Sequence, residues 1–419
     1  MAAITLHPGR LIGELRVPPS KSVAHRAIIC AALAKGESMV SPVDVSDDMR
    51  ATLACMTALG AYWKRENDAL RLSGQAFANK PCPDMDCLES GSTLRFVIPL
   101  SLALAKGGVF HTKGRLKERP LGPYEAIFQK QGISFEKTAD GFCAKGILCA
   151  GQFDLPGDVS SQFVTGLLLA LPLLQGDSQI NITSPMESEG YVQLTLDVMN
   201  AYGVTVHKKD ACTFVVPGGQ SYQPCNYTVE GDDTQAAVLL CAGALGSQVT
   251  LKGLSPASHQ GDRAVAGILE QMGASVCVSD SAFTVKPGPL QGIVIDGGQI
   301  PDTLPMLALT MCLSEGESRI ENAGRLRHKE CDRLFATVRE LTKLGADITS
   351  QGDTILIHGQ ESLTGDVSVS SYDDHRMAMM LSIAALHCKA PITLDNPACV
   401  KKSWPSFWED YLQLGGNIT

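Results

Sequence analysis

The chain of 419 residues is 44% apolar and carries 44 acidic against 35 basic side chains, a net charge of −9. Its length exceeds the roughly 250 to 300 residues at which a single hydrophobic core stops growing, so we expect two domains. The negative net charge argues against sequence-independent binding to nucleic acid or to an anionic membrane, so any anionic ligand needs a locally basic cleft.

The cysteines and the apolar segments give no sign of a metal site, of export or of a membrane. The fourteen cysteines form no CxxC pair, and the closest two, Cys82 and Cys87, lack the partners of a metal site, so free thiols are expected. The longest apolar segment, FVTGLLLALPLL, is too short to cross a bilayer, and the N-terminus has no signal-like stretch. We therefore expect a soluble cytoplasmic protein.

The first 75 residues show the predicted order of elements. Residues 20–36 and 47–61 have the pattern of helices and enclose a strand at 37–43, and residues 62–67 and 69–75 alternate as a hairpin does. With the strand that enters it, the unit is βαβαββ. Gly60 follows the second helix because a helix end commonly needs a left-handed residue, which glycine adopts without steric cost.

This unit recurs along the chain. A polar residue that opens an apolar helix recurs at intervals of 70, 70, 72, 70 and 71 residues, at Ser20, Ser90, Ser160, Asp232, Asp302 and Asp373. A glycine that closes a helix recurs at intervals of 72, 71, 70, 72 and 70, at Gly60, Gly132, Gly203, Gly273, Gly345 and Gly415. Six copies predict an α/β fold with three repeats in each of two domains, 19–227 and 1–18 plus 228–419.

The six repeated helix starts are candidate anion sites. A helix N-terminus offers unpaired backbone N–H groups and a partial positive charge. Serine and aspartate there are also ordinary N-caps. Cations are disfavoured at such positions, yet Lys21, Arg26, Arg95 and Arg376 lie within the first two turns of theirs. Their placement against the helix dipole indicates an anion between cation and helix.

Nine motifs follow the order of one known family. They are PSKSVAHRAIICAALA, SDDMRATLACMTALGA, SGSTLRF, RLKERP, GDVSSQF, IPDTLPML, RLRHKECDRL, YDDHRMAM and KKSWPSF. With them the chain resembles the 5-enolpyruvylshikimate-3-phosphate (EPSP) synthases, or 3-phosphoshikimate 1-carboxyvinyltransferases. The resemblance implies an enolpyruvyl transferase-like fold of two domains, with three βαβαββ units each and an active site in a cleft that closes on its ligands.

The resemblance also implies a reaction. The enolpyruvyl group of phosphoenolpyruvate moves to the 5-hydroxyl of shikimate 3-phosphate and phosphate leaves, in the shikimate pathway to chorismate and the aromatic amino acids. No cofactor and no metal are expected. The expected partners are these two substrates, with no nucleic acid and no membrane, and a monomer is the default state.

The resemblance assigns binding residues of both substrates. The phosphoenolpyruvate contacts are Lys21, Gly91, Arg119, Gln162, Arg333, Arg376 and Lys402. The shikimate 3-phosphate contacts are Lys21, Ser22, Arg26, Ser160, Ser161, Gln162, Ser188, Asp302 and Lys329. Guanidinium groups suit such anions because they bind carboxylate and phosphate bidentately. Gly91 is expected to matter because a Cβ there would project toward the small substrate, where glyphosate competes in the family.

Three residues are expected to move protons. The reaction needs a proton delivered to the methylene carbon and one removed from the attacking hydroxyl. Asp302 is the predicted general base. Glu330 is the predicted proton donor to carbon, with Lys21 as the open alternative. His375 is expected to line the site and support Arg376, although Glu330 and Arg333 could also be an ordinary surface pair.

Several residues depart from the usual family pattern, among them Gly190, which stands where proline is usual. Glu89 stands where asparagine is usual, Ser92 where threonine is usual, and Phe96 where proline is frequent. Cys331 replaces Thr or Ser, and Glu189 replaces a Lys or Arg beside the expected phosphate-binding serines. These changes bear on affinity and inhibitor response rather than on the reaction.

Two alternatives remain open. The UDP-N-acetylglucosamine enolpyruvyl transferases share the length and the repeats, but they carry a cysteine in the loop that here is HTKGRLKERPLGPY, and Lys-Asn where this chain has Lys21 and Ser22. The other alternative is a non-catalytic paralogue that binds phosphorylated ligands. An assay of phosphate release separates all three.

Overall fold

The repeated glycines end helices as the sequence predicts. The computed structural model describes residues 3–74, 81–279 and 282–419. All six marker glycines follow a helix and have positive φ angles, between 66° and 112°. Such angles are strained for residues with a Cβ, so these positions favour glycine.

The repeated polar residues cap four helices and not the other two. Four accept a hydrogen bond from a backbone N–H of the first turn: Ser20, Ser90, Ser160 and Asp232. The fifth helix begins after a turn, so Thr303 and not Asp302 is its N-cap. In the sixth, Asp374 is the cap and Asp373, with φ at 56°, lies one residue outside. The carboxylate of Asp302 is thereby available for tertiary contacts.

The chain folds into two compact units. One is Pro19–Val229, called here the 19–229 unit. The other joins Met1–Pro18 to Glu230–Thr419 and is called the 230–419 unit. Residues 1–2 of the predicted second domain and Gln75 of the predicted hairpin lie outside the described residues.

The elements of the 19–229 unit are short strands and mostly buried helices. Its α-helices are α1 (Lys21–Leu33), α2 (Asp47–Ala58), α3 (Gly91–Leu104), α4 (Gly122–Lys130), α5 (Ser161–Ala170) and α6 (Glu189–Ala201), and its 3-10 helices are η1 (Gly114–Glu118) and η2 (Leu171–Leu173). Its strands are β3 (Glu37–Ser41), β4 (Tyr62–Glu66), β5 (Ala69–Ser73), β6 (Asp84–Asp86), β7 (Gly107–His111), β8 (Ser134–Lys137), β9 (Gly141–Lys145), β10 (Gln152–Leu155), β11 (Ser178–Ile182), β12 (His207–Lys208), β13 (Thr213–Val216) and β14 (Asn226–Thr228).

The 230–419 unit has the same kinds of element. Its α-helices are α7 (Asp233–Ala244), α8 (Ala264–Met272), α9 (Leu304–Cys312), α10 (Arg333–Lys343), α11 (His375–Leu386) and α12 (Phe407–Gln413), and its 3-10 helices are η3 (Gly261–Arg263), η4 (Gly324–His328) and η5 (Pro397–Lys402). Its strands are β1 (Ile4–Leu6), β2 (Ile12–Arg16), β15 (Gln248–Lys252), β16 (Ser275–Val278), β17 (Ala282–Lys286), β18 (Val294–Asp296), β19 (Glu317–Glu321), β20 (Asp347–Gln351), β21 (Thr354–His358), β22 (Ser368–Val369) and β23 (Ile392–Leu394).

One sheet topology recurs in both units. Sheets β14-β3-β5-β4, β6-β7-β9-β8 and β10-β11-β13-β12 each join a parallel entering strand to an antiparallel hairpin. Sheets β16-β17-β15-β2 and β18-β19-β21-β20 do the same, and β1 pairs with β23 in the three-stranded sheet β1-β23-β22. In the pairs β6-β7, β10-β11, β18-β19 and β22-β23 the parallel crossover contains a helix, which begins soon after the entering strand. The strands β14 and β2 instead pair with strands that are far away along the chain.

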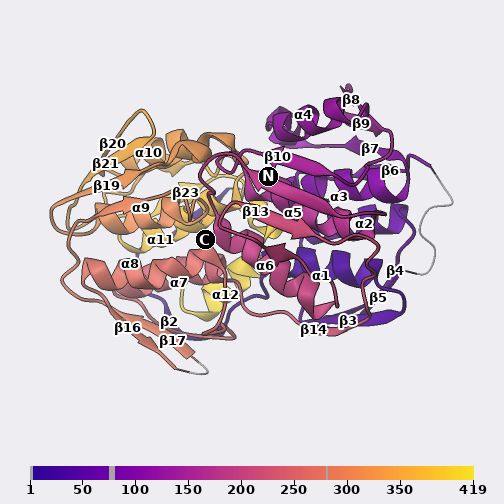
Figure 1. The fold of residues 1–419 in the computed structure, drawn as a ribbon. Coiled ribbons are helices and arrows are strands. Elements are labelled where there is room, and N and C mark those ends of the chain that lie inside the picture. Colours follow the sequence, from indigo (N-terminus) through magenta and orange to yellow (C-terminus); the bar gives the residue numbers. More distant parts are fainter. Residues whose placement is uncertain (1–2, 75–80, 280–281) are drawn as a thin grey trace. The chain divides into compact units, whose positions relative to one another are not determined.

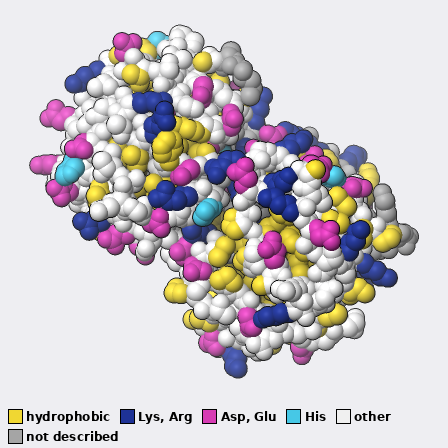
Figure 2. Space-filling view, turned by 90° about the horizontal axis from the view of Figure 1, so that it is seen from above, with side chains coloured by type: hydrophobic (Ala, Val, Ile, Leu, Met, Phe, Trp, Pro, Cys, Tyr) yellow, Lys and Arg dark blue, Asp and Glu magenta, His cyan; other side chains and the backbone are white. Residues whose placement is uncertain are grey.

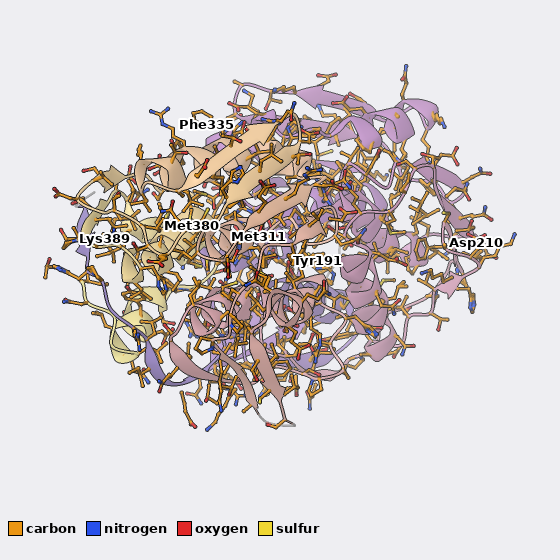
Figure 3. The ribbon with its side chains drawn as sticks, turned by 90° about the vertical axis from the view of Figure 1, so that its left-hand side faces the viewer. Tyr191, Asp210, Met311, Phe335, Met380 and Lys389 are labelled. Atoms are coloured by element: carbon orange, nitrogen blue, oxygen red, sulfur yellow. The ribbon has the colours of Figure 1, made fainter. Side chains whose placement is uncertain are left out.

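The core of each unit consists of these crossover helices. Almost every residue of α1, α3 and α5 is buried in the 19–229 unit, and the same holds for α7, α9 and α11 in the other. Met377, Met379 and Met380 are fully buried, as core methionines are expected to be; Figure 3 shows Met380 and Met311 inside, and Phe335 at the surface. Within the described ranges, no helix is long and apolar enough to cross a membrane.

Candidate active site

The buried cations are more informative than the surface charges. On the face seen in Figure 2, basic and acidic side chains are interspersed. Among the described residues, the buried basic side chains are Arg26, Arg95, Arg333, Arg376 and Lys402. The four arginines lie in the first two turns of core or site helices, and the lysine ends η5. Lys and Arg are rarely buried without partners, so the partners define what each residue does.

Arg26 connects three helix starts in the 19–229 unit. Its N–H groups donate to Thr195 Oγ1 at 2.8 Å, Ser22 O at 2.7 Å, Thr165 Oγ1 at 3.3 Å and Tyr191 O at 3.0 Å. These acceptors use four of its five N–H bonds. Burial lowers the pKa of Arg26 to about 10, so the guanidinium remains charged at neutral pH. Arg26 therefore holds α1 against α5 and α6 and has one N–H left for a ligand.

Lys21 is the first residue of α1, and Ser160 is the N-cap of α5. Lys21 Nζ donates to Asp48 Oδ2 at 2.9 Å, and its side chain is 18% exposed. Ser160 Oγ accepts from the backbone N–H of Gln162 at 3.3 Å, and the buried Ser161 begins α5. A hydroxyl that accepts still has its own O–H to donate, so capping leaves Ser160 able to bind a phosphate oxygen.

Gln162 is held by two residues of α3. Its amide donates to Ser92 Oγ at 2.9 Å and accepts from Arg95 at 2.8 Å. Gly91 lies beneath them: a Cβ at that position would be 2.7 Å from Arg119 Nη1 and 2.9 Å from Arg95 Nη1. A methyl group here would therefore displace two guanidinium groups, which is a reason for a glycine in addition to the expected approach of the small substrate.

Ser188 and Ser160 begin helices whose preceding loops are bonded together. Gly157 N donates to Ser184 Oγ at 2.9 Å, and the backbone N–H of Glu187 donates to Gly157 O at 3.1 Å. Ser188 itself is buried, with a left-handed φ of 57°. These bonds join the two loops that lead into the helices of the three serines that the resemblance assigns to the shikimate phosphate.

Arg333 is the centre of the 230–419 group. The side chain is 1% exposed, and its N–H groups donate to Asp374 Oδ2, Asp302 Oδ1 and Glu330 Oε2 at 2.7 Å each and to Asp374 Oδ1 at 3.2 Å. Burial lowers the pKa of Arg333, but the three carboxylates outweigh burial and raise it well above its ordinary value. Four of five N–H bonds are used, so Arg333 organises the carboxylates and offers one N–H to a ligand.

Asp302 is held in its ionised form. Its Oδ1 accepts from Lys329 Nζ at 2.9 Å and from Arg333 at 2.7 Å. Burial raises the pKa of Asp302, but the positive charges of Lys329, Arg333 and Arg376 outweigh it and hold the pKa well below its ordinary value. In the described part of the chain, Oδ2 accepts no hydrogen bond, so this oxygen can face a substrate hydroxyl.

Arg376 and Lys402 complete the cationic side of this group. Arg376 Nη1 donates to Gln235 Oε1 at 3.1 Å, and Gln235 Nε2 donates to Ser403 Oγ at 3.0 Å. Within the described residues, Arg376 Nε is buried without a hydrogen-bond acceptor. Lys402 Nζ lies 3.9 Å from Glu330 Oε1. A buried guanidinium N–H without an acceptor costs free energy unless a ligand fills the position.

The departures from the family pattern find local partners. Ser92 accepts from Gln162, as described, and the Phe96 ring lies 5.3 Å from the guanidinium carbon of Arg26. Cys331 Sγ lies 3.5 Å from Asp374 Oδ2. Glu189 accepts from Lys208 Nζ at 2.7 Å, so a lysine from β12 lies beside the changed residue. A Cβ on Gly114, the first residue of η1, would overlap the Glu89 carboxylate, so these two residues lie against each other.

Asp48, Gln235 and Asp374 were not predicted as site residues, and Arg95 was predicted only as a cation beside a helix start. Each of the four contacts a residue that was predicted to bind substrate. Arg95, Gln235 and Asp374 share one signal, a polar side chain at the start of an otherwise apolar core helix. Asp48 has no comparable signal, because its partner Lys21 is 27 residues away.

The comparisons agree with this architecture. The fold is that of the enolpyruvyl transferases: NikO from Streptomyces tendae has a TM-score of 0.81 over 100% of this chain and 98% of its own, at 18% identity. EPSP synthase from Acinetobacter baumannii also has a TM-score of 0.81, over 100% of both chains, at 25% identity.

The sequence comparisons identify the family. The family model of EPSP synthase (3-phosphoshikimate 1-carboxyvinyltransferase) matches residues 6–411. The 3-phosphoshikimate 1-carboxyvinyltransferase of Clostridium perfringens strain 13 is 46% identical over 420 residues, which cover 99% of each chain. This chain belongs to the EPSP synthase family, as its nine motifs predict.

Proposed function

We propose that this chain transfers the enolpyruvyl group of phosphoenolpyruvate to the 5-hydroxyl of shikimate 3-phosphate and releases phosphate. Family membership over nearly the whole chain supports this activity. The observation that carries it is the buried group around Arg333, where an ionised carboxylate lies beside cations. Two anionic substrates need such a surplus of positive charge, because their own charges repel each other.

Phosphoenolpyruvate is bound, in this proposal, by the residues that retain donors. Arg376 supplies its buried Nε, and Lys402 supplies a compact charge beside Glu330. Arg333 contributes one N–H and fixes the carboxylates around it. The remaining contacts come from the 19–229 unit: Lys21, the backbone of Gly91, Arg119 and Gln162.

Shikimate 3-phosphate is bound by hydroxyl groups and by the Asp302 pair. Ser160, Ser161 and Ser188 donate to the phosphate, while Ser22, Arg26 and Lys21 contact the ring and its carboxylate. Lys329 binds the ring and holds Asp302 Oδ1, which leaves Oδ2 for the 5-hydroxyl.

Asp302 acts as the general base in this mechanism. Because its pKa lies well below the ordinary value, the carboxylate is ionised throughout the physiological range, but the same shift makes it a weak base, so the hydroxyl proton is transferred only as the new C–O bond forms. The proton passes to Oδ2 as the 5-oxygen bonds to the enolpyruvyl carbon. Lys329 and Arg333 then stabilise the carboxylate again when the proton leaves.

Glu330 delivers the proton to the methylene carbon, and Lys21 is the alternative donor. Oε2 of Glu330 accepts from Arg333 at 2.7 Å and Oε1 lies 3.9 Å from Lys402 Nζ, so in this step Glu330 would take up a proton on Oε1 before it delivers it to carbon. Lys21 belongs to the 19–229 unit, and its ammonium group, which donates to Asp48, is the other possible source of the proton. Both donors satisfy the need for an acid opposite the base.

The proposal requires ligands to draw the two units together. A tetrahedral intermediate loses less to water in a closed site, and closure around ligands is a common domain motion. We expect a smaller radius of gyration in small-angle scattering when shikimate 3-phosphate and glyphosate are added together. An unchanged radius with both ligands bound would contradict closure.

The deciding experiment follows phosphate release by the purified full chain. Phosphoenolpyruvate with shikimate 3-phosphate should give steady phosphate release, and Asp302→Asn should abolish most of it. Release only with UDP-N-acetylglucosamine as acceptor would identify the other transferase activity. Binding of both substrates without release in either mixture would indicate a non-catalytic paralogue.

A further inference from the structure

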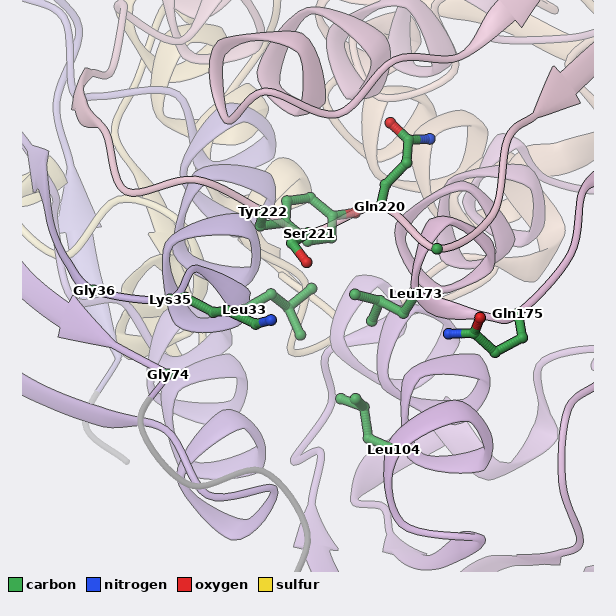
Figure 4. A pocket seen from close by; sticks show the side chains of 11 residues that line it. Leu33, Lys35, Gly36, Gly74, Leu104, Leu173, Gln175, Gln220, Ser221 and Tyr222 are labelled. Atoms are coloured by element: carbon green, nitrogen blue, oxygen red, sulfur yellow. The ribbon is translucent and has the colours of Figure 1, made fainter.

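A pocket lies at the opposite end of the three helices that carry the 19–229 site residues. Leu33 ends α1, Leu104 ends α3 and Leu173 ends η2, which continues α5; all three line a cavity of about 870 Å³ (Figure 4). Ligand pockets are commonly about 300 to 1,000 Å³. The α1 helix of 13 residues places the pocket about 20 Å from the helix starts. The pocket is therefore separate from the candidate active site.

The repeat supplies the apolar part of this pocket. Leu33, Leu104 and Leu173 are 71 and 69 residues apart, so they occupy equivalent positions in the three repeats of this unit. Leu104 and Leu173 are only partly buried, so each keeps apolar surface that faces the pocket. Tyr222 closes one side, and its hydroxyl donates to Leu169 O at 2.9 Å, which fixes the ring.

The polar side chains around these leucines are not engaged elsewhere. Lys35, Gln175 and Ser221 line the pocket, and within the described residues their side chains make no hydrogen bond or ion pair. In contrast, the Gln220 amide accepts from Thr205 N and donates to Thr205 O and Pro217 O. Gln220 therefore lines the pocket but has no donor left for a ligand. An ammonium, an amide and a hydroxyl thus surround an apolar surface.

The 230–419 unit shows that such a pocket is not a necessary result of the repeat. There, residues 9–11 cross the corresponding helix ends: Gly9 N donates to Leu386 O at 3.3 Å at the end of α11, and Leu11 N donates to Ser247 Oγ at 3.2 Å just after α7. Leu6 and Leu11 are fully buried in that core. In the 19–229 unit the described residues leave a pocket at the corresponding place, and Lys35, Gln175 and Ser221 line it with side-chain donors that they do not use elsewhere among those residues.

We propose that this pocket binds a small carboxylate that carries an apolar body of about the size of one aromatic ring. The body packs on Leu33, Leu104 and Leu173, where burial of apolar surface supplies affinity. The carboxylate pairs with the Lys35 ammonium, and Ser221 and Gln175 donate to its oxygens. Charge complementarity favours the acid over a neutral analogue, and this inference does not depend on the proposed enzymatic activity.

The test is a titration of the full chain with phenylacetate, followed by methyl NMR with labelled leucine. Shifts should be largest for Leu33, Leu104 and Leu173, assigned through Leu→Ile variants. The neutral 2-phenylethanol should bind about fivefold more weakly, because it lacks the partly exposed ion pair. Acetate, which lacks the ring, should bind at least about tenfold more weakly.

Matched lysine variants locate the charge. Lys35→Gln should weaken phenylacetate about fivefold, whereas Lys106→Gln, at the equivalent position of the second repeat, should not change its affinity. Saturating shikimate 3-phosphate should leave the affinity unchanged. The proposal is overturned if phenylacetate produces no shifts in these leucines, if both lysine variants bind as the parent does, or if shikimate 3-phosphate displaces the probe.

Discussion

Asp233 has a buried carboxyl group whose charge the fold does not compensate. It is the first residue of α7 and is 3% exposed, and within the described residues its Oδ2 has no hydrogen-bond partner. Burial raises the pKa of Asp233 to about 8; Arg263 opposes this shift, while Asp232, Glu230 and Asp262 add to it. Asp233 is therefore mostly protonated at pH 7 in the folded protein.

This shift makes stability fall as the pH rises. Between an unfolded pKa of 3.8 and the folded value of about 8, the folded state holds a proton that the unfolded state has lost. Over that range Asp233 costs about 1.4 kcal/mol per pH unit, or up to about 4 kcal/mol between pH 5 and pH 8. Asn cannot ionise, so Asp233→Asn should gain stability over the parent by this amount as the pH rises from 5 to 8.

Urea unfolding at several pH values measures the effect. A Trp63→Phe background leaves Trp404 and Trp408, so the fluorescence reports the 230–419 unit alone. The free energy of unfolding of Asp233→Asn minus that of the parent should grow between pH 5 and pH 8 and level off above it. Asp366→Asn, at an exposed position, is the control. A constant difference across this range would refute the raised pKa and the argument from burial.

Three further changes test the two groups of site residues. Gly91→Ala should raise the KM for phosphoenolpyruvate about 10- to 100-fold, because its Cβ would displace Arg119 and Arg95; the control Gly122→Ala, with open space around its Cβ, should not. Asp302→Asn should lower kcat about 10²- to 10⁴-fold in steady-state kinetics with little change in shikimate 3-phosphate affinity. Asp374→Asn should lower the free energy of unfolding by about 3 to 5 kcal/mol in urea titrations, because Arg333 loses a buried ionic partner; an unchanged midpoint would contradict the role assigned to Asp374.

The local parts of the fold could be predicted from the sequence. Helix ends depend on a few neighbouring residues, so the spacing of Gly60 and its five equivalents located the left-handed positions correctly. The hairpin of β4 and β5 follows from alternation in the same way. Asp302 and Asp373 were less predictable, because a turn at 301–303 and two left-handed residues at 372 and 373 each move the cap by one position.

The partners of the site residues could not be predicted from spacing. Arg26 was expected to contact substrate, yet four of its five N–H bonds reach oxygens up to 169 residues away along the chain. Arg333 was expected to bind an anion, but most of its donors are taken by carboxylates of its own unit. Such long-range hydrogen bonds depend on the side-chain rotamers that the packed helices allow, and a local sequence pattern does not predict those rotamers.

The buried arginines differ in how many of their hydrogen-bond donors are used within the protein. Arg26 and Arg333 each donate four of their five N–H bonds to protein oxygens, so their positions are fixed without a ligand. Within the described residues, Arg376 Nε has no hydrogen-bond acceptor and Asp302 Oδ2 accepts no hydrogen bond. Arg333 binds Asp302 directly, and it binds Asp374, which caps the helix that carries Arg376. Electrostatic catalysis requires charges that need no reorganisation during the reaction. In the proposed mechanism, a carboxylate that fixes a buried arginine is therefore a positioning group, and Asp374 is the clearest case, since it binds Arg333 and the start of the helix that carries Arg376.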